Sequence, residues 1–315
     1  MHTKKDFSRK TIVIIKNCAL FAVYVLLVFS VKAQENIAVK LGYPADAKLL
    51  IIHADDLGVS HSENMASIDA IENGSVNSAS VMMPTPWVLE VANYAKSHAD
   101  THDFGLHLVL SSEWKNYRWG PVSSTSKVPS LINEHGYFHA GCRSGINIKE
   151  VEMELRAQID RAYAMGLVPT HLDSHMGCLF QTEELIEIYL KMGQVYKLPV
   201  LITNQIPLAL IEKYDVKVIL EDILTIMPEQ YEKGPDDYYI NAIKNLKPGL
   251  STFLIHTAYD NDELKGMTID HPEWGNEWRQ KDYDFFTSDS CVKILKKENI
   301  QLVTWRQVKE VFYNK

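Results

Sequence analysis

Short apolar runs alternate with amphipathic stretches along most of the chain. Runs of strand length lie at residues 48–53, 76–83, 104–110, 168–172, 198–202, 216–220, 250–256 and 300–303. Helical patterns and turn residues separate these runs, and strands that alternate with helices predict a mainly parallel sheet. We therefore expect a single-domain α/β fold, a distorted TIM-like β/α barrel with mainly parallel strands. A doubly wound open sheet is the architectural alternative.

Two of the predicted helices have recognisable ends. Ser62 is a good N-cap for a helical pattern that stops at Gly74, and Asn147 caps a strongly periodic pattern that stops at Gly166. Residues 111–147, in contrast, show no periodicity and contain Ser, Gly and Pro. A stretch of this length is too long for an ordinary connection, which indicates a functional loop or a lid.

The N-terminal segment differs from the rest of the chain. Lysines and an arginine precede an apolar run at residues 18–31, and small or apolar residues stand just before Gln34. This pattern predicts a signal peptide over residues 1–33 and leaves a single domain over residues 34–315. An uncleaved membrane anchor is the alternative. We expect the protein to be exported, to the periplasm or outside the cell, and attached to the membrane only if the segment stays uncleaved.

Composition and charge exclude several classes of protein. Apolar residues make up 46% and charged residues 23% of the chain, which excludes a mainly disordered or collagen-like protein. The net charge is −8, and without residues 1–33 the chain has 26 Lys and Arg against 39 Asp and Glu, a net charge of −13. Such a chain has no basic surface for phosphates, so we expect no nucleic-acid partner.

Cysteine usage leaves the question of a disulfide open. Cys142, Cys178 and Cys291 follow the predicted signal peptide, and they show no zinc-ribbon or CxxC spacing. One pair could be oxidised in an exported protein, but the spacing does not say which pair.

The first candidate site is His53-Ala-Asp55-Asp56-Leu-Gly58, at the end of the first predicted strand. One of two adjacent carboxylates can bind a cation while the other addresses water or substrate, which suits a metal-assisted hydrolase. The alternative is a simple turn that precedes a helix.

Histidines follow the ends of other predicted strands. His107 lies in GLHLVL, and in PTHLDSH the strand alternation places His171, Asp173 and His175 on one side. Two imidazoles and a carboxylate suit a divalent cation, although a polar strand end with a helix cap is the alternative. His256 ends a further strand, and an imidazole suits general acid–base chemistry. Because the carboxyl ends of parallel strands meet at one face, these residues predict a single site.

The motifs resemble those of a known family. IIHADDLGVS, SVNSASVMM, GLHLVL, PTHLDSH and FLIHTAYD are similar in order and spacing to segments of the YdjC-like carbohydrate deacetylases, which include ChbG-type and HpnK-type enzymes. The resemblance covers nearly the whole chain after Leu49. It implies a distorted β/α barrel, one divalent metal ion, with Mg or Zn expected first, and hydrolysis of N-acetyl groups on sugars.

The resemblance also implies roles for individual residues. Asp56, His107 and His175 would be the metal ligands, Asp55 the general base and His256 the general acid. In such a site the metal lowers the pKa of a bound water and polarises the acetyl carbonyl.

Supporting residues and departures from the family pattern surround these positions. His171 and Asp173 would orient His175. The family commonly has Asn where His53 stands, a further histidine within residues 176–178, and Pro-Gly after the strand-end histidine where Thr-Ala stands here. None of these departures removes an expected metal ligand.

Candidate substrate contacts come from later loops and from the long unpatterned stretch. Tyr259, Trp274 and Trp278 could stack on sugar faces, and Arg143 could contact an acetyl or acid group. Core packing for the aromatic residues and a solvated loop charge for Arg143 are the alternatives. Arg279 and Asp282 could bind substrate or form a surface pair.

Three functions remain open from the sequence. The first is a metal-dependent hydrolase that removes N-acetyl groups from amino-sugar-containing oligo- or polysaccharides. The second is another metal-assisted hydrolase of glycans, which cleaves a glycoside or phosphoester bond. The third is a glycan-binding protein on an inactive deacetylase scaffold. The natural glycan, the metal and the oligomeric state are left open.

Overall fold

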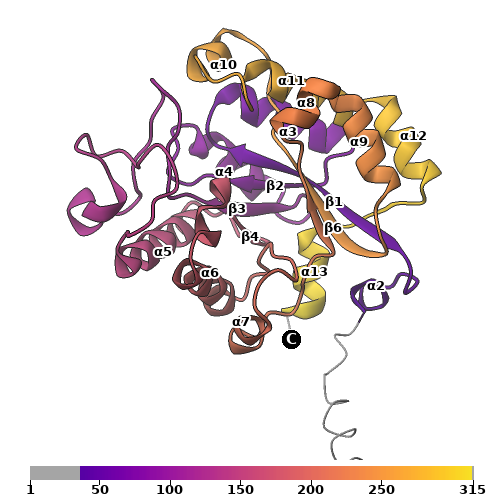
Figure 1. The fold of residues 1–315 in the computed structure, drawn as a ribbon, viewed down its shortest axis with the longest axis horizontal. Helices are drawn as coiled ribbons and strands as arrows, with labels where there is room; N and C mark the ends of the chain where they lie inside the picture. Colours follow the sequence, from indigo (N-terminus) through magenta and orange to yellow (C-terminus); the bar gives the residue numbers. More distant parts are fainter. Residues whose placement is uncertain (1–35, 314–315) are drawn as a thin grey trace, which may run out of the picture. The chain divides into compact units, whose positions relative to one another are not determined.

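The computed structural model describes residues 36–313. The predicted signal peptide, residues 1–33, lies outside this range, so it stays a prediction, as does the domain boundary that follows it. Among the described helices, none is long and apolar enough to cross a membrane. The described part of the chain is built around one parallel sheet with helices on both sides (Figure 1).

Within residues 36–313 the sheet has seven strands, and all of their pairings are parallel. In chain order they are β1 (Lys48–Leu57), β2 (Ser78–Val81), β3 (Phe104–Leu108), β4 (Leu172–Ser174), β5 (Asp222–Leu224), β6 (Gly249–Ile255) and β7 (Gln301–Leu302). Their order across the sheet is β4-β3-β2-β1-β6-β5, and β7 pairs with β1 outside this path.

Two isolated backbone pairings span the gap between β4 and β5. Val200 pairs with Leu172 of β4, and Leu220 pairs with Thr203 in the segment between them. The two runs predicted as strands here therefore lie in the expected places but pair at single positions instead of forming full strands. The sheet curls around through these pairings, and the predicted class, a distorted barrel of mainly parallel strands, is confirmed.

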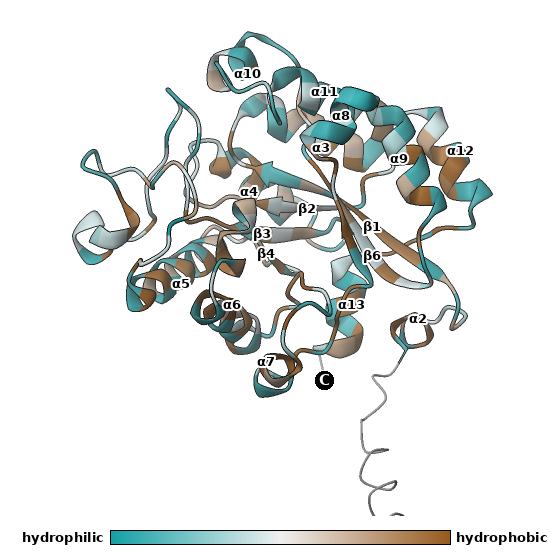
Figure 2. Ribbon diagram, in the orientation of Figure 1, coloured by the Kyte–Doolittle hydropathy of each residue, from teal (hydrophilic) through white to brown (hydrophobic). Residues whose placement is uncertain are grey.

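β1 is the central strand and is buried from residue 49 to residue 57. One of its edges pairs with β6, and the other pairs with β7 at its start and with β2 at its end. Asn77 lies where this edge of β1 changes its partner from β7 to β2. Its side chain accepts the N–H of Ile52 and donates to the carbonyl of Val303, so it replaces the missing strand-to-strand hydrogen bonds. Figure 2 shows that the body of β1 is hydrophobic and its tip hydrophilic, so polar chemistry starts where the strand ends.

The helices cover the sheet and its edges. Figure 1 shows α5, α6 and α7 on one side of the sheet, and α3, α8, α9, α11 and α12 on the other. Their bounds, with those of the remaining helices, are α2 (Ile37–Lys40), α3 (His61–Asn73), α4 (Val88–Ser97), α5 (Ile148–Ala164), α6 (Glu183–Tyr196), α7 (Leu208–Lys213), α8 (Pro228–Lys233), α9 (Pro235–Lys244), α10 (Asp262–Met267), α11 (Asn276–Phe286), α12 (Asp289–Lys297) and α13 (Trp305–Phe312).

Local capping explains where the first helix begins. Ser60, and not Ser62, is the N-cap of α3, because its hydroxyl accepts the N–H of Glu63. Ser62 lies inside the helix and donates to Glu263, which connects α3 to α10. The predicted cap of α5 is confirmed, since the Asn147 side chain accepts the N–H of the second helical residue.

Residues 111–147, here called the long loop, contain little regular structure. Two short 3-10 turns, η1 (Thr125–Lys127) and η2 (Pro129–Leu131), lie in its middle. Large side chains nevertheless anchor it to the core. Those that are buried include Trp114, Trp119 and Phe138. The loop is therefore docked on the body of the protein and does not hang free in solvent.

We expect Gly105→Ala to destabilise the fold. A Cβ atom at Gly105 in β3 would lie 2.3–2.5 Å from ring atoms of His171, which is fully buried. Overpacking of this kind costs about 1–3 kcal/mol in the free energy of unfolding, measured by urea denaturation. Gly266→Ala in α10 is the matched control, because nothing lies within 4 Å of its added Cβ and alanine favours helix. Equal stability of the two variants would contradict the expected clash.

Candidate metal centre and active site

The carboxyl end of β1 carries two buried carboxylates on a distorted backbone. Asp55 and Asp56 are 4% and 1% exposed. The register between β1 and β2 shifts between Ala54 and Leu57, and Asp56 has a left-handed φ of 66°. A non-glycine residue in this region is strained, and such strain gathers at functional sites where the surroundings hold it. The distortion lets two consecutive carboxylates reach different partners.

Asp56, His107 and His175 form a group that could hold a metal ion. Their ligand atoms lie within 4.8 Å of one another. Asp56 Oδ1 is 3.3 Å from His107 Nε2 and 3.2 Å from His175 Nδ1, yet it is buried without a hydrogen-bond partner. A buried oxygen without a donor is costly, and a divalent cation between it and two imidazole nitrogens would remove that cost. Two histidines and one carboxylate are a donor set that zinc and related cations accept.

Two further groups of buried residues could hold a metal in the described part of the chain. They are His53 with His171 and Asp173, and Asp55 with His107 and Asp173. Both groups use Asp173, whose two oxygens already bind His107 Nδ1 at 2.6 Å and His53 Nε2 at 2.9 Å. A cation in either place would displace these hydrogen bonds. The group with the unpartnered carboxylate oxygen is therefore the stronger candidate.

Asp173 fixes the orientation of His107. The two residues pair across β3 and β4, and His107 Nδ1–H donates to Asp173, which leaves Nε2 free for a cation. Burial lowers the pKa of His107, but Asp173 and Asp55 outweigh it and hold the pKa well above its usual value. Negative charge that attracts a proton to this ring also attracts a metal ion. From the sequence, we expect Asp173 and His171 to orient His175. In the structure Asp173 instead orients His107, because the register of β3 and β4 sets the two residues side by side.

His171 packs on the far side of the cluster. Its ring lies over Gly105, stacks on Trp305 at 5.2 Å between centroids and meets His53 edge-on at 4.9 Å. Burial holds its pKa well below the usual value, so the ring is neutral. The structure thus places His171 as a packing group beneath the site.

His53 connects the two carboxylates that do not belong to the candidate ligands. Its Nε2 lies 2.9 Å from Asp173 Oδ2 and 3.0 Å from Asp55 Oδ1, and its Nδ1 lies 2.9 Å from the Ser78 hydroxyl. Burial lowers the pKa of His53, but Asp173 and Asp55 outweigh it and raise the pKa to about 9. Ser80 also donates to Asp55, at 3.3 Å. Asp55 is therefore held at a fixed place beside the metal-binding group.

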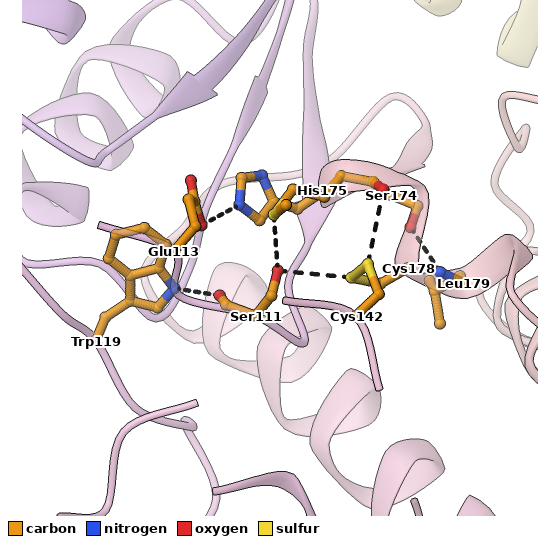
Figure 3. The surroundings of a disulfide bond; sticks show 9 residues. Ser111, Glu113, Trp119, Cys142, Ser174, His175, Cys178 and Leu179 are labelled. Carbon is orange, nitrogen blue, oxygen red and sulfur yellow. Dashed lines mark hydrogen bonds and ion pairs between the residues drawn. A yellow bond between two sulfur atoms is a disulfide. The ribbon is translucent and has the colours of Figure 1, made fainter. Parts of the chain in front are cut away.

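Glu113 was not predicted as a site residue. It comes from the long loop, and its carboxylate lies 3.1 Å from His175 Nε2 (Figure 3). An N–H donated to Glu113 leaves His175 Nδ1 to face Asp56. Burial lowers the pKa of His175, but Glu113 and Asp56 outweigh it and raise the pKa to about 9. The signal available in the sequence was an acidic residue at the start of the loop that directly follows the His107 strand.

Arg279 of α11 neutralises part of this charge. It is 2% exposed, so it is neither a surface pair nor a solvated substrate contact. Its guanidinium donates to Asp56 Oδ2 at 2.8 Å and to Glu63, and it lies over the ring of Trp114. Burial raises the pKa of Asp56, but Arg279 outweighs it and holds the pKa well below its usual value. Burial raises the pKa of Glu63 well above its usual value despite Arg279, which favours the neutral form of Glu63. The positive charge of Arg279 therefore stabilises mainly the Asp56 carboxylate.

His256 lies on the other side of Asp56. Its Nε2 is 3.9 Å from Asp56 Oδ2, and its backbone N–H donates to Asp282 at 2.8 Å. Tyr239 also donates its hydroxyl to Asp282, which is fully buried and so is not part of a surface pair. Burial raises the pKa of Asp282 to about 7 and lowers the pKa of His256 to about 4. The imidazole of His256 is therefore neutral at pH 7.

Trp278 is not available for sugar stacking. It is 2% exposed, and its ring is stacked against Tyr231 at 3.9 Å and against Trp274 at 5.1 Å between centroids. The prediction that it stacks on substrate is wrong, because α11 turns it toward the core. Trp274 is half-buried and adopts a left-handed φ of 52°.

The remaining two predicted substrate contacts are at least partly exposed. Tyr259 is half-buried and packs edge-on against Tyr283, at 5.1 Å between centroids. Arg143 is exposed in the long loop and lies 3.0 Å from His139. Their contact with a substrate stays a prediction.

Comparisons with known proteins match nearly the whole described chain. The model of the family described as YdjC-like protein matches residues 49–297. A carbohydrate deacetylase from Thermus thermophilus is 29% identical over 280 residues, which cover 84% of this chain and 96% of that protein. One from Thermoanaerobacter pseudethanolicus is 26% identical and covers 83% of this chain and 100% of that protein.

A solved structure shares the fold. It is from Enterococcus faecalis and is described as a candidate cellobiose-phosphate cleavage protein. Its TM-score is 0.72 at 23% identity, and the match covers 83% of this chain and 99% of that chain. At this identity the likeness supports the fold alone.

We expect Glu113→Ala to weaken divalent-metal binding about tenfold, because loss of a carboxylate partner frees the ring of a metal-binding histidine. Calorimetric titration of the metal-free protein measures the change. Glu113→Gln should recover part of the affinity, since its amide oxygen accepts the same hydrogen bond. Glu134→Ala, an exposed carboxylate in the same loop, is the control. Affinity that is equal in all three variants would contradict the role of Glu113.

Proposed function

The chain belongs to the YdjC-like family, and from this premise we propose that it is a metal-dependent hydrolase that removes N-acetyl groups from amino-sugar-containing oligo- or polysaccharides. The observation that carries the proposal is the unpartnered carboxylate oxygen of Asp56, buried between His107 and His175. Relatives named carbohydrate deacetylase align with most of the chain, which supports the class of reaction.

Three residues would hold the metal, and Asp55 would act beside it. A divalent cation bound by Asp56, His107 and His175 would lower the pKa of water and polarise the acetyl carbonyl. Asp55 lies beside this group, 3.9 Å from His107 Nδ1, and His53 and Ser80 hold it in place. Asp55 would remove the proton from the attacking water, whose hydroxyl then adds to the acetyl carbon.

His256 would serve the leaving amine. It faces Asp56 from the carboxyl end of β6, the strand next to β1, and its backbone N–H donates to Asp282. A general acid must carry a proton, and burial keeps His256 neutral at pH 7 because its pKa is lowered to about 4. Asp55 would pass the proton that it takes from water to His256. The protonated His256 would then give this proton to the leaving nitrogen as the C–N bond breaks, which returns both residues to their starting states.

We expect metal-dependent acetate release from N-acetylated oligosaccharides. Chelation should abolish the release, and addition of single cations, with Mg and Zn tested first, should restore it. Asp55→Asn should lower kcat at least ~100-fold and leave metal affinity within a few-fold, because Asp55 moves a proton and is not a ligand. Asp289→Asn, a fully exposed carboxylate on α12, is the control.

Each alternative predicts a different product. New reducing ends or phosphate without acetate would indicate a glycosidase or a phosphoesterase. Glycan binding without any product would indicate an inactive scaffold. Acetate release that persists fully in Asp55→Asn would refute the proposed base.

We also propose that the protein acts outside the cytoplasm. The charged and apolar N-terminal pattern supports export, and so does a disulfide between Cys142 and Cys178, because disulfides persist in oxidising compartments. Cell fractionation should find the protein in the periplasm or outside the cell, and mass spectrometry should find a mature chain that begins at Gln34. An intact chain in the membrane would indicate an anchor, and a cytoplasmic protein with reduced cysteines would refute export.

A further inference from the structure

The turn that carries His175 has a strained backbone. η3 (His175–Phe180) follows β4 directly, and Met176 and Gly177 have left-handed φ values of 53° and 64°. Within the turn, the hydroxyl of Ser174 accepts the N–H of Leu179 at 3.1 Å. A left-handed methionine persists only where its surroundings hold it. The position of the histidine therefore depends on what contacts this turn.

The long loop supplies three of these contacts (Figure 3). A disulfide joins Cys142 of the loop to Cys178 of the turn, with 5.0 Å between their Cα atoms. The Ser111 hydroxyl lies 3.4 Å from the sulfur of Met176. Glu113 binds the imidazole itself. One covalent and two non-covalent attachments thus come from a single segment.

The loop is stiff enough to act as a support. The buried carboxylate of Glu154 on α5 accepts the N–H groups of Val122 and Ser123, each at 2.9 Å. The indole of Trp119 donates to the carbonyl of Ser111 at 2.9 Å and is buried. Because the loop is docked on α5, the disulfide ties the strained turn to the body of the protein.

We propose that the Cys142–Cys178 disulfide positions His175 for metal binding and so sets the metal affinity of the site. The inference rests on the proposed function, because it needs the metal-binding group. Without the cross-link the turn would sample other backbone conformations, and only those that aim His175 Nδ1 at Asp56 would bind a cation. Apparent affinity falls in proportion to the competent fraction. The disulfide is therefore a positioning element of the site and not only a brace of the fold.

The test is Co²⁺ titration of Cys142→Ser/Cys178→Ser, followed by visible absorption and performed well below the melting temperature. Both cysteines are replaced because a single remaining thiol could itself bind the metal. We expect the Kd to rise about tenfold or more, as for loss of other groups that orient a ligand, and the absorption bands to change. Cys291→Ala is the control, because it removes a buried thiol from α12, away from the turn.

The outcomes separate positioning from stability. A double variant with a lower melting temperature but unchanged Kd and spectrum would overturn the proposal. The proposal would also fail if Cys142, Cys178 and Cys291 all titrate as free thiols in the denatured wild-type protein, because the disulfide would then be absent. If the double variant does not fold, wild-type protein that is reduced in the cold and then blocked at the freed thiols with a methylating reagent takes its place, so that no thiol is left to bind the metal. Wild-type protein that binds no Co²⁺ would refute the proposed function itself, and the inference with it.

Discussion

Negative charge buried at one end of the sheet is the constraint on which the rest of the site depends. Asp55, Asp56 and Asp173 are each at most 4% exposed. A buried carboxylate without a partner costs several kcal/mol, so each of these must meet a positive charge or a donor. Arg279 of α11 pairs with Asp56. The imidazoles of His53 and His107 contact the other two carboxylates. The packing of α11 and of the β3–β4 pair is therefore tied to where this charge lies.

The pattern of apolar strands alone predicts that the candidate site residues lie together at one face of the sheet. Parallel strands align their carboxyl ends, so five residues at or near the ends of four apolar runs could be expected at one face before any contact was known. The residues that the structure brings together there are Asp55, Asp56, His107, His175 and His256. This prediction needed only the location of each strand end, which apolar periodicity shows well.

The pairing within the cluster could not be predicted from the pattern. Asp173 serves His107 because of the register of β3 and β4, and a shift of one residue would send the side chain to the other face. Glu113 lies in a loop without periodicity, where no rule links a residue to a strand end. Trp278 turned out to be core because Tyr231, from a separate helix, covers its ring. Each of these depends on long-range packing.

The histidine at position 53 follows from the same charge constraint. The family pattern commonly has asparagine here, and an amide can donate hydrogen bonds but carries no charge. His53 lies between Asp55 and Asp173, within 3.0 Å of both, and their charges raise its pKa to about 9. A protonated ring adds one positive charge where Arg279 does not reach. In this chain a protonated imidazole therefore neutralises charge that a neutral amide could not. The Asp56 carboxylate in the adjacent candidate metal group keeps its own negative charge, which a cation could use.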